Sequence, residues 1–456
     1  MSLRKVVLRH ALVPTYLVAC LLLGGASAAG FAANLCLQLA ALPIICAALW
    51  VLVMDPPPQI KTTPLILSGL IVVVMALQLV PLPPSIWTRL PGRDAVASGF
   101  RILAMPLPCV PLSLYPGGTV ASLLSLLPAM AALLAVTVLG GFRGSLISWA
   151  LISVTTLSVA IGALQLVGGQ DSGAYIYATT NFGVAVGFFA NGNHMATLLL
   201  VSIPFLGALQ LSLLRRARSA RNISAVRLLT AAMLVVFLVG LLTNFSLAGL
   251  GLSIPVVLIC FLSFGSERRK PKWWILGVSL LVSVGAIALI LFGPFGNNLI
   301  GEQHSYKQLS RQTSFRLTMD AAQEYLPVGS GVGTFQRVYR TQEPLGDVIN
   351  VYMNHAHSDY LELFLEMGLL GVALIIAFFV WWVRRVRAIW GAETPDYYAR
   401  AGAIASGTIL LHSLVDYPLR TAAISVVFAI SIGLMSEARP FIRRRTTGTS
   451  TRHVTL

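Results

Sequence analysis

Charged residues are scarce in this chain, and acidic residues are the scarcest of them. Of the 456 residues, 11% are charged, and 16 Asp and Glu stand against 32 Lys and Arg. A soluble domain usually carries about 25% charged residues, because its surface must be solvated. Too little polar material is present to cover a globule of this size, so the composition excludes a soluble globular protein.

Paired cysteines are also absent. No cysteine spacing is typical of a zinc site or of a disulfide framework. Four of the five cysteines lie in or beside apolar runs, and the full set is Cys20, Cys36, Cys46, Cys109 and Cys260. We interpret them as small side chains that pack between helices.

Long apolar runs take the place of charge. Hydrophobic residues make up 56% of the chain, and a run of about 20 such residues is long enough to cross a bilayer. The runs fall near 11–31, 33–54, 64–80, 118–140, 146–168, 194–214, 228–245, 247–265, 273–293, 363–383, 400–416 and 421–437. We therefore predict an all-α membrane protein with about 12 transmembrane helices, in which residues 1–456 form a single integral membrane domain. The basic N-terminus resembles a signal peptide, but the second run follows without a clear cleavage site, which predicts a retained first helix.

The basic residues predict how the helices are oriented. Cytoplasmic segments of membrane proteins are enriched in Lys and Arg. If the N-terminus is inside, the inner segments hold 23 of the 32 basic residues and the outer segments hold nine. We therefore predict that both termini are cytoplasmic. The net charge of +16 follows from this pattern, so we predict no nucleic-acid partner.

Two outer segments are long. Residues 81–117 are rich in Pro, which predicts a compact lid on the membrane surface. Residues 294–362, between predicted helices 9 and 10, form the longest polar stretch, and connections of this length are usually functional. This large periplasmic loop holds three histidines and five cations: His304, His355, His357, Lys307, Arg311, Arg316, Arg337 and Arg340. We expect the active site there.

The strongest local signal surrounds His357. Ser358 or Asp359 is placed to cap a helix, and Glu362 suits its first turn. His357 would then lie at the outer mouth of a membrane helix, where a neutral imidazole takes a proton from an attacking hydroxyl. The alternative is an interfacial histidine that bonds water or a carbonyl. The sequence His355-Ala-His357 also suits a metal, but alternate residues on a helix point apart and no third ligand is evident, so no metal is predicted.

A second signal runs from Ser314 to Phe335. It predicts an amphipathic helix, a Pro stop and a Gly-rich turn. Arg316 near the helix start suits a two-pronged hydrogen bond to phosphate, and the glycines would let backbone N–H groups approach an anion. The alternative is a solvated cation beside a flexible loop.

A third signal is Gly187-Phe-Phe-Ala-Asn-Gly-Asn-His-Met-Ala196, which ends an outer loop and opens a helix. Asn191 and Asn193 are suited either to fixing turns or to binding sugar hydroxyls, and their setting favours turn chemistry.

These three segments, in this order and on one side of the membrane, resemble the O-antigen ligase and O-antigen polymerase superfamily. The matching pieces are Phe188-Phe-Ala-Asn-Gly-Asn-His194, Arg316 with Pro327-Val-Gly-Ser-Gly-Val-Gly-Thr-Phe335, and His357-Ser-Asp-Tyr-Leu-Glu362 with Gly368-Leu-Leu-Gly371. Two further segments resemble exopolysaccharide members of that group: Pro81-Leu-Pro-Pro-Ser-Ile-Trp87 and His412-Ser-Leu-Val-Asp-Tyr-Pro-Leu-Arg420.

The resemblance implies a multi-pass enzyme of the bacterial inner membrane that needs no cofactor. Its donor would be a polyprenyl-diphosphate-linked glycan, and its acceptor a glycan or lipid A-core. The family's catalytic histidine falls on His357 and its loop arginine on Arg316. A further arginine is expected in the segment Thr243-Asn-Phe-Ser-Leu247, where Leu247 stands instead. Another cation must then neutralise the diphosphate, and the candidates are Arg311, Arg340 and Arg420; His355 is a further candidate for substrate binding.

The predicted reaction is an inverting transfer, in which His357 removes the acceptor proton while Arg316 and a second cation stabilise the departing diphosphate. The exopolysaccharide-like segments favour a polymerase over a ligase. A transporter or flippase of lipid-linked glycans is the alternative, but it would place polar residues near mid-membrane, where most runs are apolar. A non-catalytic glycan-binding protein is favoured only by Leu247.

Overall fold

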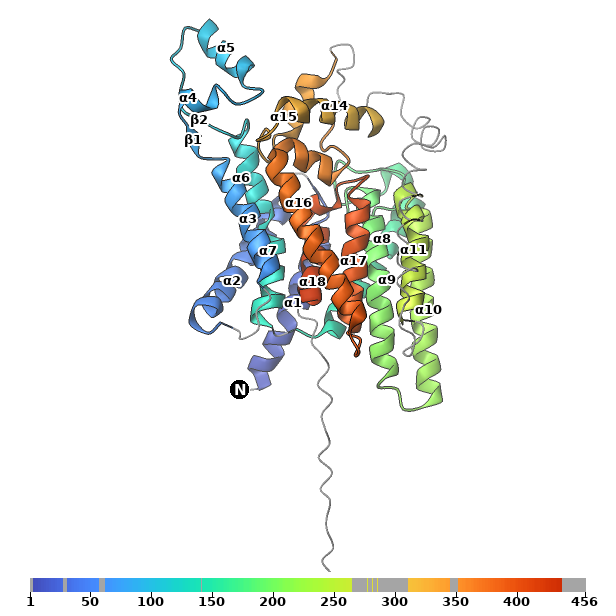
Figure 1. Cartoon of the computed structure of the whole chain (residues 1–456). Coiled ribbons are helices and arrows are strands. Elements are labelled where there is room, and N and C mark those ends of the chain that lie inside the picture. The colour runs from blue at the N-terminus through green and yellow to red at the C-terminus, as the bar shows by residue number, and fades with distance from the viewer. Residues whose placement is uncertain are drawn as a thin grey trace, which may run out of the picture.

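The computed structural model describes residues 3–27, 31–56, 62–140, 142–264, 311–344 and 352–436, with three isolated helical positions between 277 and 285. The predicted run at 273–293 therefore lies almost entirely outside the described residues, as do His304 and Lys307. The described part is a bundle of helices with one two-stranded sheet (Figure 1).

Apolar helices form the bundle. They are α1 (Leu3–Leu23), α2 (Ala32–Met54), α3 (Thr63–Leu77), α6 (Pro116–Ser125), α7 (Leu127–Leu134), η1 (Ala135–Leu139), α8 (Gly144–Gly168), α9 (Gly192–Leu214), α10 (Ala220–Thr243), α11 (Leu247–Phe264), α16 (Asp359–Gly391), α17 (Tyr397–His412) and α18 (Ala422–Ser436). In the described residues, seven helical segments are long and apolar enough to cross a membrane, and stretches of α1, α3 and α18 are apolar but shorter. The predicted all-α membrane fold is confirmed, and the count of twelve stays a prediction.

Helix α9 lies at the centre of the bundle, where it packs against α8, α10, α11 and α17. Helices in a membrane gain little from excluding lipid, so close packing through small residues holds them together. Gly402 of α17 illustrates this, because a Cβ added there would lie 2.7 Å from the backbone oxygen of Ser431 in α18. The buried faces of α9 and α17 thus set the spacing of the helices that carry the polar site described below.

The described parts of both long segments that were predicted to be outer fold over one end of this bundle (Figure 1). The first contains β1 (Pro81–Leu82), α4 (Pro84–Trp87), α5 (Asp94–Ile102) and β2 (Val110–Pro111), with β1 and β2 paired antiparallel. The second contains α14 (Arg311–Glu324) and α15 (Phe335–Gln342). The two are joined by a hydrogen bond from Leu114 N to Ser330 O (2.9 Å), and Thr119 Oγ1 of α6 donates to Val332 O (2.6 Å). We call this unit, residues 81–115 with 311–344, the cap.

The start of α1 and the end of α18 lie at the end of the bundle opposite the cap (Figure 1). At the cap end, Gly24 after α1 accepts a hydrogen bond from Ala423 at the start of α18 (3.0 Å). At the far end, Arg385 near the end of α16 bonds Met435 O, and Arg215 after α9 donates to the Tyr397 hydroxyl (2.9 Å). Arg385 and Arg215 thus lie at the end that the predicted orientation makes cytoplasmic; which end is cytoplasmic stays a prediction.

Cysteine labelling tests that orientation. We expect Cys109, exposed in the cap, to react with a membrane-impermeant maleimide added to spheroplasts, when the other four cysteines are replaced. Ala220→Cys, exposed at the start of α10, should react only after the membrane is opened. The control is a variant without any cysteine. The reverse pattern would place the cap in the cytoplasm and exclude a periplasmic reaction.

Candidate functional site

His357 lies where the cap meets the bundle, directly before α16. Ser358 caps this helix, as predicted, and accepts a hydrogen bond from Leu361 N (3.4 Å). The backbone of His357 is left-handed, with φ at 53°. Such a conformation costs a residue with a Cβ about 1–3 kcal/mol and persists only where its surroundings impose it. The side chain is 22% exposed, so it is held in a fixed place and still open to a substrate.

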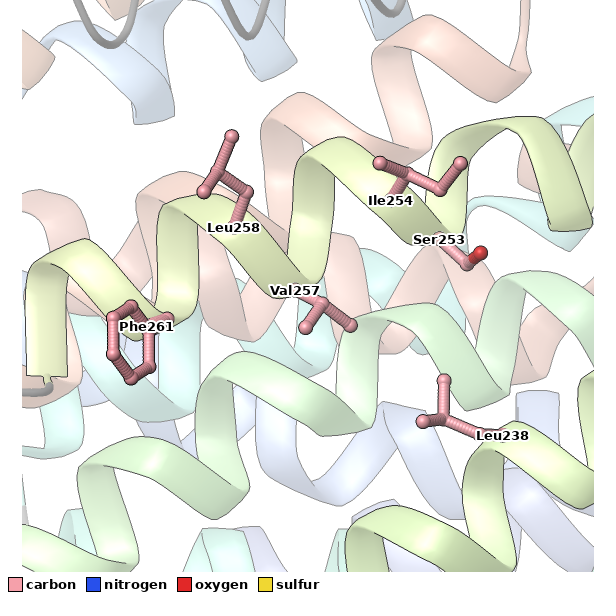
Figure 2. A pocket seen from close by; sticks show the side chains of 6 residues that line it. All are labelled: Leu238, Ser253, Ile254, Val257, Leu258 and Phe261. Atoms are coloured by element: carbon pink, nitrogen blue, oxygen red, sulfur yellow. The ribbon is translucent and has the colours of Figure 1, made fainter.

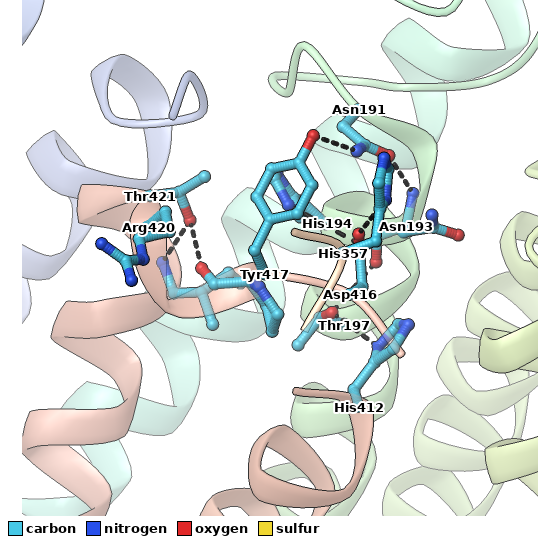
Figure 3. A network of polar contacts seen from close by, with 12 residues as sticks. Asn191, Asn193, His194, Thr197, His357, His412, Asp416, Tyr417, Arg420 and Thr421 are labelled. Atoms are coloured by element: carbon cyan, nitrogen blue, oxygen red, sulfur yellow. Dashed lines mark hydrogen bonds and ion pairs between the residues drawn. The ribbon is translucent and has the colours of Figure 1, made fainter. Parts of the chain in front are cut away.

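The buried Asp416 lies between His357 and a second histidine (Figure 3). Its Oδ1 is 3.5 Å from His357 Nδ1, and its Oδ2 is 3.7 Å from His194 Nε2. Both Asp416 and His194 are almost completely buried. Because the carboxylate faces Nδ1, the Nε2 atom of His357 is left for a substrate. This arrangement of a carboxylate behind an imidazole is typical of a general base.

Tyr417 connects the elements around the histidines. Its hydroxyl accepts a hydrogen bond from Asn191 Nδ2 (3.3 Å), and Asn354 Nδ2 lies at the same distance. Its ring centre lies 5.1 Å from His194, 4.5 Å from His355 and 5.1 Å from His357. Burial, and then the charge of the neighbouring Asp416, raise the pKa of the Tyr417 phenol above its usual value, so this side chain stays protonated and orients its neighbours.

The two predicted asparagines form the turn that opens α9. Asn191 caps the helix by accepting a hydrogen bond from Asn193 N (2.8 Å), and Asn193 Oδ1 accepts one from the Ser246 hydroxyl (2.7 Å). Asn191 therefore fixes the turn, as predicted, and a role of either asparagine in sugar binding stays a prediction. The Ser246 contact also places Leu247, where the further arginine was expected, beside this turn. The segment therefore reaches the site without supplying a cation.

Arg420 is brought into the site, but carboxylates surround it. Its guanidinium lies 3.4 Å from Asp359, 3.4 Å from Glu362 and 3.6 Å from Glu366. Burial disfavours the charge of Arg420, yet the three carboxylates raise its pKa above the usual value. His355 joins the same group, since its Nδ1 is 2.9 Å from Glu362 Oε1. Both residues were predicted to bind substrate, and in this structure both bind acidic side chains of α16.

The Gly-rich turn binds an anion, but the anion is internal. Glu366 Oε1 accepts hydrogen bonds from Gly333 N (2.8 Å) and Phe335 N (3.3 Å). Gly368, with φ at 58°, interrupts α16 so that this contact can form, and a Cβ there would lie 2.2 Å from Pro327 O. The glycines thus allow the predicted close approach of an anion, which is a side chain of the protein and not a substrate phosphate.

The remaining predicted cations lie on the cap. Ser314 bonds Ala356 O (3.4 Å), which holds α14 against the histidine segment, while Arg316 lies on the exposed face of the same helix. Arg340, on α15, lies over the Tyr352 ring at 5.1 Å. Arg311 begins α14, and its side chain is outside the described part. Within the described residues, no hydrogen bond or ion pair joins Arg316 or Arg340 to the histidines.

Sequence reasoning assigned no role to His194, Asp416 or Tyr417. All three lie in quoted motifs, in Phe188–His194 and His412–Arg420, so their motifs were the available signal. Among the described residues, no three His, Cys, Asp or Glu side chains are placed to hold a metal ion; the expectation that none is needed stays a prediction.

A separate recess lies between α10 and α11 (Figure 2). It is apolar and open, with one serine among its lining residues, which are Leu238, Ser253, Ile254, Val257, Leu258 and Phe261. It holds no titratable group, and we assign it no chemistry.

Comparison with protein families matches residues 229–376 to O-antigen ligases, which confirms the predicted resemblance to the O-antigen ligase superfamily. The matched range includes Arg316, His355 and His357 but neither Asp416 nor the α9 turn. No curated protein matches the chain. With the multi-helix membrane fold, the match supports a glycan-processing function in a membrane.

Proposed function

From this similarity to O-antigen ligases, we propose that the protein transfers a polyprenyl-diphosphate-linked glycan onto a sugar hydroxyl at the periplasmic membrane face of a bacterial inner membrane. The observation that carries the proposal is His357, partly exposed at the end of the bundle with the buried Asp416 behind its Nδ1. A lipid diphosphate has its tail in the bilayer and its charge at the interface, which is the level at which this proposal puts His357.

The reaction is a single displacement. The acceptor hydroxyl oxygen attacks the anomeric carbon, the bond from that carbon to the diphosphate oxygen breaks, and the hydroxyl proton passes to His357 Nε2. The configuration at carbon inverts, and the polyprenyl diphosphate leaves. A positioned histidine base typically contributes about 10²–10⁴-fold to the rate, and hydrogen bonds in such sites often shorten only when substrate binds. The 3.5 Å separation of His357 and Asp416 leaves room for such shortening.

The departing diphosphate needs cations beside it to stabilise its charge, and the cap carries exposed cations. Arg420 faces three carboxylates, so it offers little net positive charge to a diphosphate. We therefore assign the diphosphate to Arg316, with Arg311 or Arg340 of the same cap beside it. We propose that these cap cations receive the charge of the lipid-linked donor.

Purified protein tests the function directly. We expect transfer when the protein in nanodiscs receives a lipid-diphosphate glycan and an acceptor. A ladder of products with lipid-linked acceptors identifies a polymerase, which the exopolysaccharide-like segments favour, and a single addition to lipid A-core identifies a ligase. Movement of lipid-linked glycan across vesicles without transfer would instead support a flippase.

Arg316 gives a second test. Arg316→Ala should lower transfer and donor binding roughly ten- to hundredfold, because a hydrogen bond to a charged group contributes about 1.5–3 kcal/mol. Arg316→Lys keeps the charge without the planar fork, so it should retain partial activity. Arg101→Ala, which removes another exposed cap cation, is the matched control. Normal donor binding by Arg316→Ala would place the diphosphate elsewhere.

A further inference from the structure

Asp416 has two imidazole neighbours, and the reaction above uses only one of them. Its carboxylate is fully buried, with Oδ1 toward His357 Nδ1 at 3.5 Å and Oδ2 toward His194 Nε2 at 3.7 Å. A buried carboxylate is costly unless donors or cations compensate its charge. The two histidines therefore compete for the charge of a single carboxylate.

His194 has little else to bond. It is 1% exposed at the start of α9. Among the described residues, neither of its ring nitrogens has a hydrogen-bond partner. Its ring packs edge-to-face against Tyr417 (5.1 Å) and Phe189 (6.4 Å), which fixes its plane and directs Nε2 to the carboxylate. Burial of an imidazole without a nearer partner is explained if Asp416 is its acceptor.

A carboxylate beside an imidazole favours the protonated ring, which cannot accept a proton. A donor on the opposite carboxylate oxygen withdraws part of that negative charge. Building on the proposed function, we propose that His194 turns its Nε2–H toward Asp416 Oδ2, 3.7 Å away, and that this N–H dipole keeps His357 in its neutral, proton-accepting form. His194 is then a positioning residue that acts through Asp416 and does not touch the substrate.

Other charged or titratable groups surround the three residues His357, Asp416 and His194. From α17 and the turn after it come His412, Tyr417 and Arg420, and from the histidine segment and α16 come His355, Asp359, Glu362 and Glu366. Most of them are already engaged with one another. Arg420 compensates the three α16 carboxylates, Glu362 holds His355, and His412 Nδ1 pairs with the Thr197 hydroxyl at 2.8 Å.

The test is the pH profile of transfer in the full-length protein. The acid limb of kcat/KM reports the group that must be neutral. His194→Leu removes the donor, so the full negative charge of Asp416 acts on His357. The midpoint of this limb should then move up by about one pH unit, at the low end of the 1–3 units by which an adjacent charge typically moves it. Asp416→Asn removes the charge and should move the midpoint down. His194→Gln, which can still donate, should keep the midpoint near that of the wild type.

His10→Gln is the matched control, because it changes a histidine of α1 that takes part in none of the contacts described around Asp416, and its limb should not move. The rate at which diethyl pyrocarbonate modifies His357, followed by mass spectrometry against pH, gives the same midpoints without substrate. An unmoved midpoint in His194→Leu overturns the inference, and if that variant does not fold, an unmoved midpoint in Asp416→Asn does so. Absence of transfer by the wild type would instead overturn the proposed function, while the modification midpoints would still decide the inference.

Discussion

His357→Ala is expected to abolish glycan transfer, with a loss of about 10²–10⁴-fold, because it removes the group that accepts the acceptor proton. The protein should stay folded. The side chain is 22% exposed, so its removal loses little packing. The left-handed backbone at this position is unfavourable for histidine and alanine alike, so the substitution does not add backbone strain. Transfer rate and thermal unfolding would be measured together on the purified variant.

His355→Ala is the matched control for that prediction. Its imidazole lies on the same segment, but its Nδ1 is held by Glu362 at 2.9 Å. Its loss should loosen the segment and lower the rate less than the loss of His357. Should His355 prove essential and His357 dispensable, the base has been assigned to the wrong histidine.

The helices and the cap end of the site could be predicted because apolar runs and helix caps are local features. The run at 194–214 matches α9, which begins at Gly192, and the predicted cap at Ser358 opens α16. The apolar run at 363–383 lies within α16, which spans Asp359–Gly391. Its first turns carry three carboxylates that hydropathy counts against a membrane helix, and Arg420 compensates them from another part of the chain.

The centre of the site could not be predicted from the sequence, because its partners also come from distant parts of the chain. Asp416 and Tyr417 follow α17, and they meet the α9 turn and the histidine segment only because α17 packs along α9. Nothing local marks a carboxylate in a turn as the partner of two distant histidines. Pairing across the bundle also changed the interpretation of Arg420, whose three partners all lie on α16.

Arg420→Ala is therefore expected to destabilise the protein by about 3–5 kcal/mol, because removal of one partner leaves buried charges uncompensated. Glu366 connects this network to the cap through Gly333 and Phe335, so the cap should loosen first, and protease should cut it in the variant. Thermal unfolding and proteolysis in nanodiscs would measure the effect. The stability of Arg420→Lys should fall between those of the wild type and Arg420→Ala, since lysine keeps the positive charge and loses the planar guanidinium fork.

A double-mutant cycle separates this role from donor binding. If Arg420 holds the carboxylates, Arg420→Ala combined with Glu362→Gln should be less destabilised than the sum of the single variants, because each removes a charge that the other leaves uncompensated. Asp320→Asn, an exposed acid on α14, should show additive effects with Arg420→Ala. If Arg420 instead binds the diphosphate, Arg420→Ala will unfold like the wild type and lose donor binding. That result would return Arg420 to the substrate side and leave the acidic face of α16 without its cation.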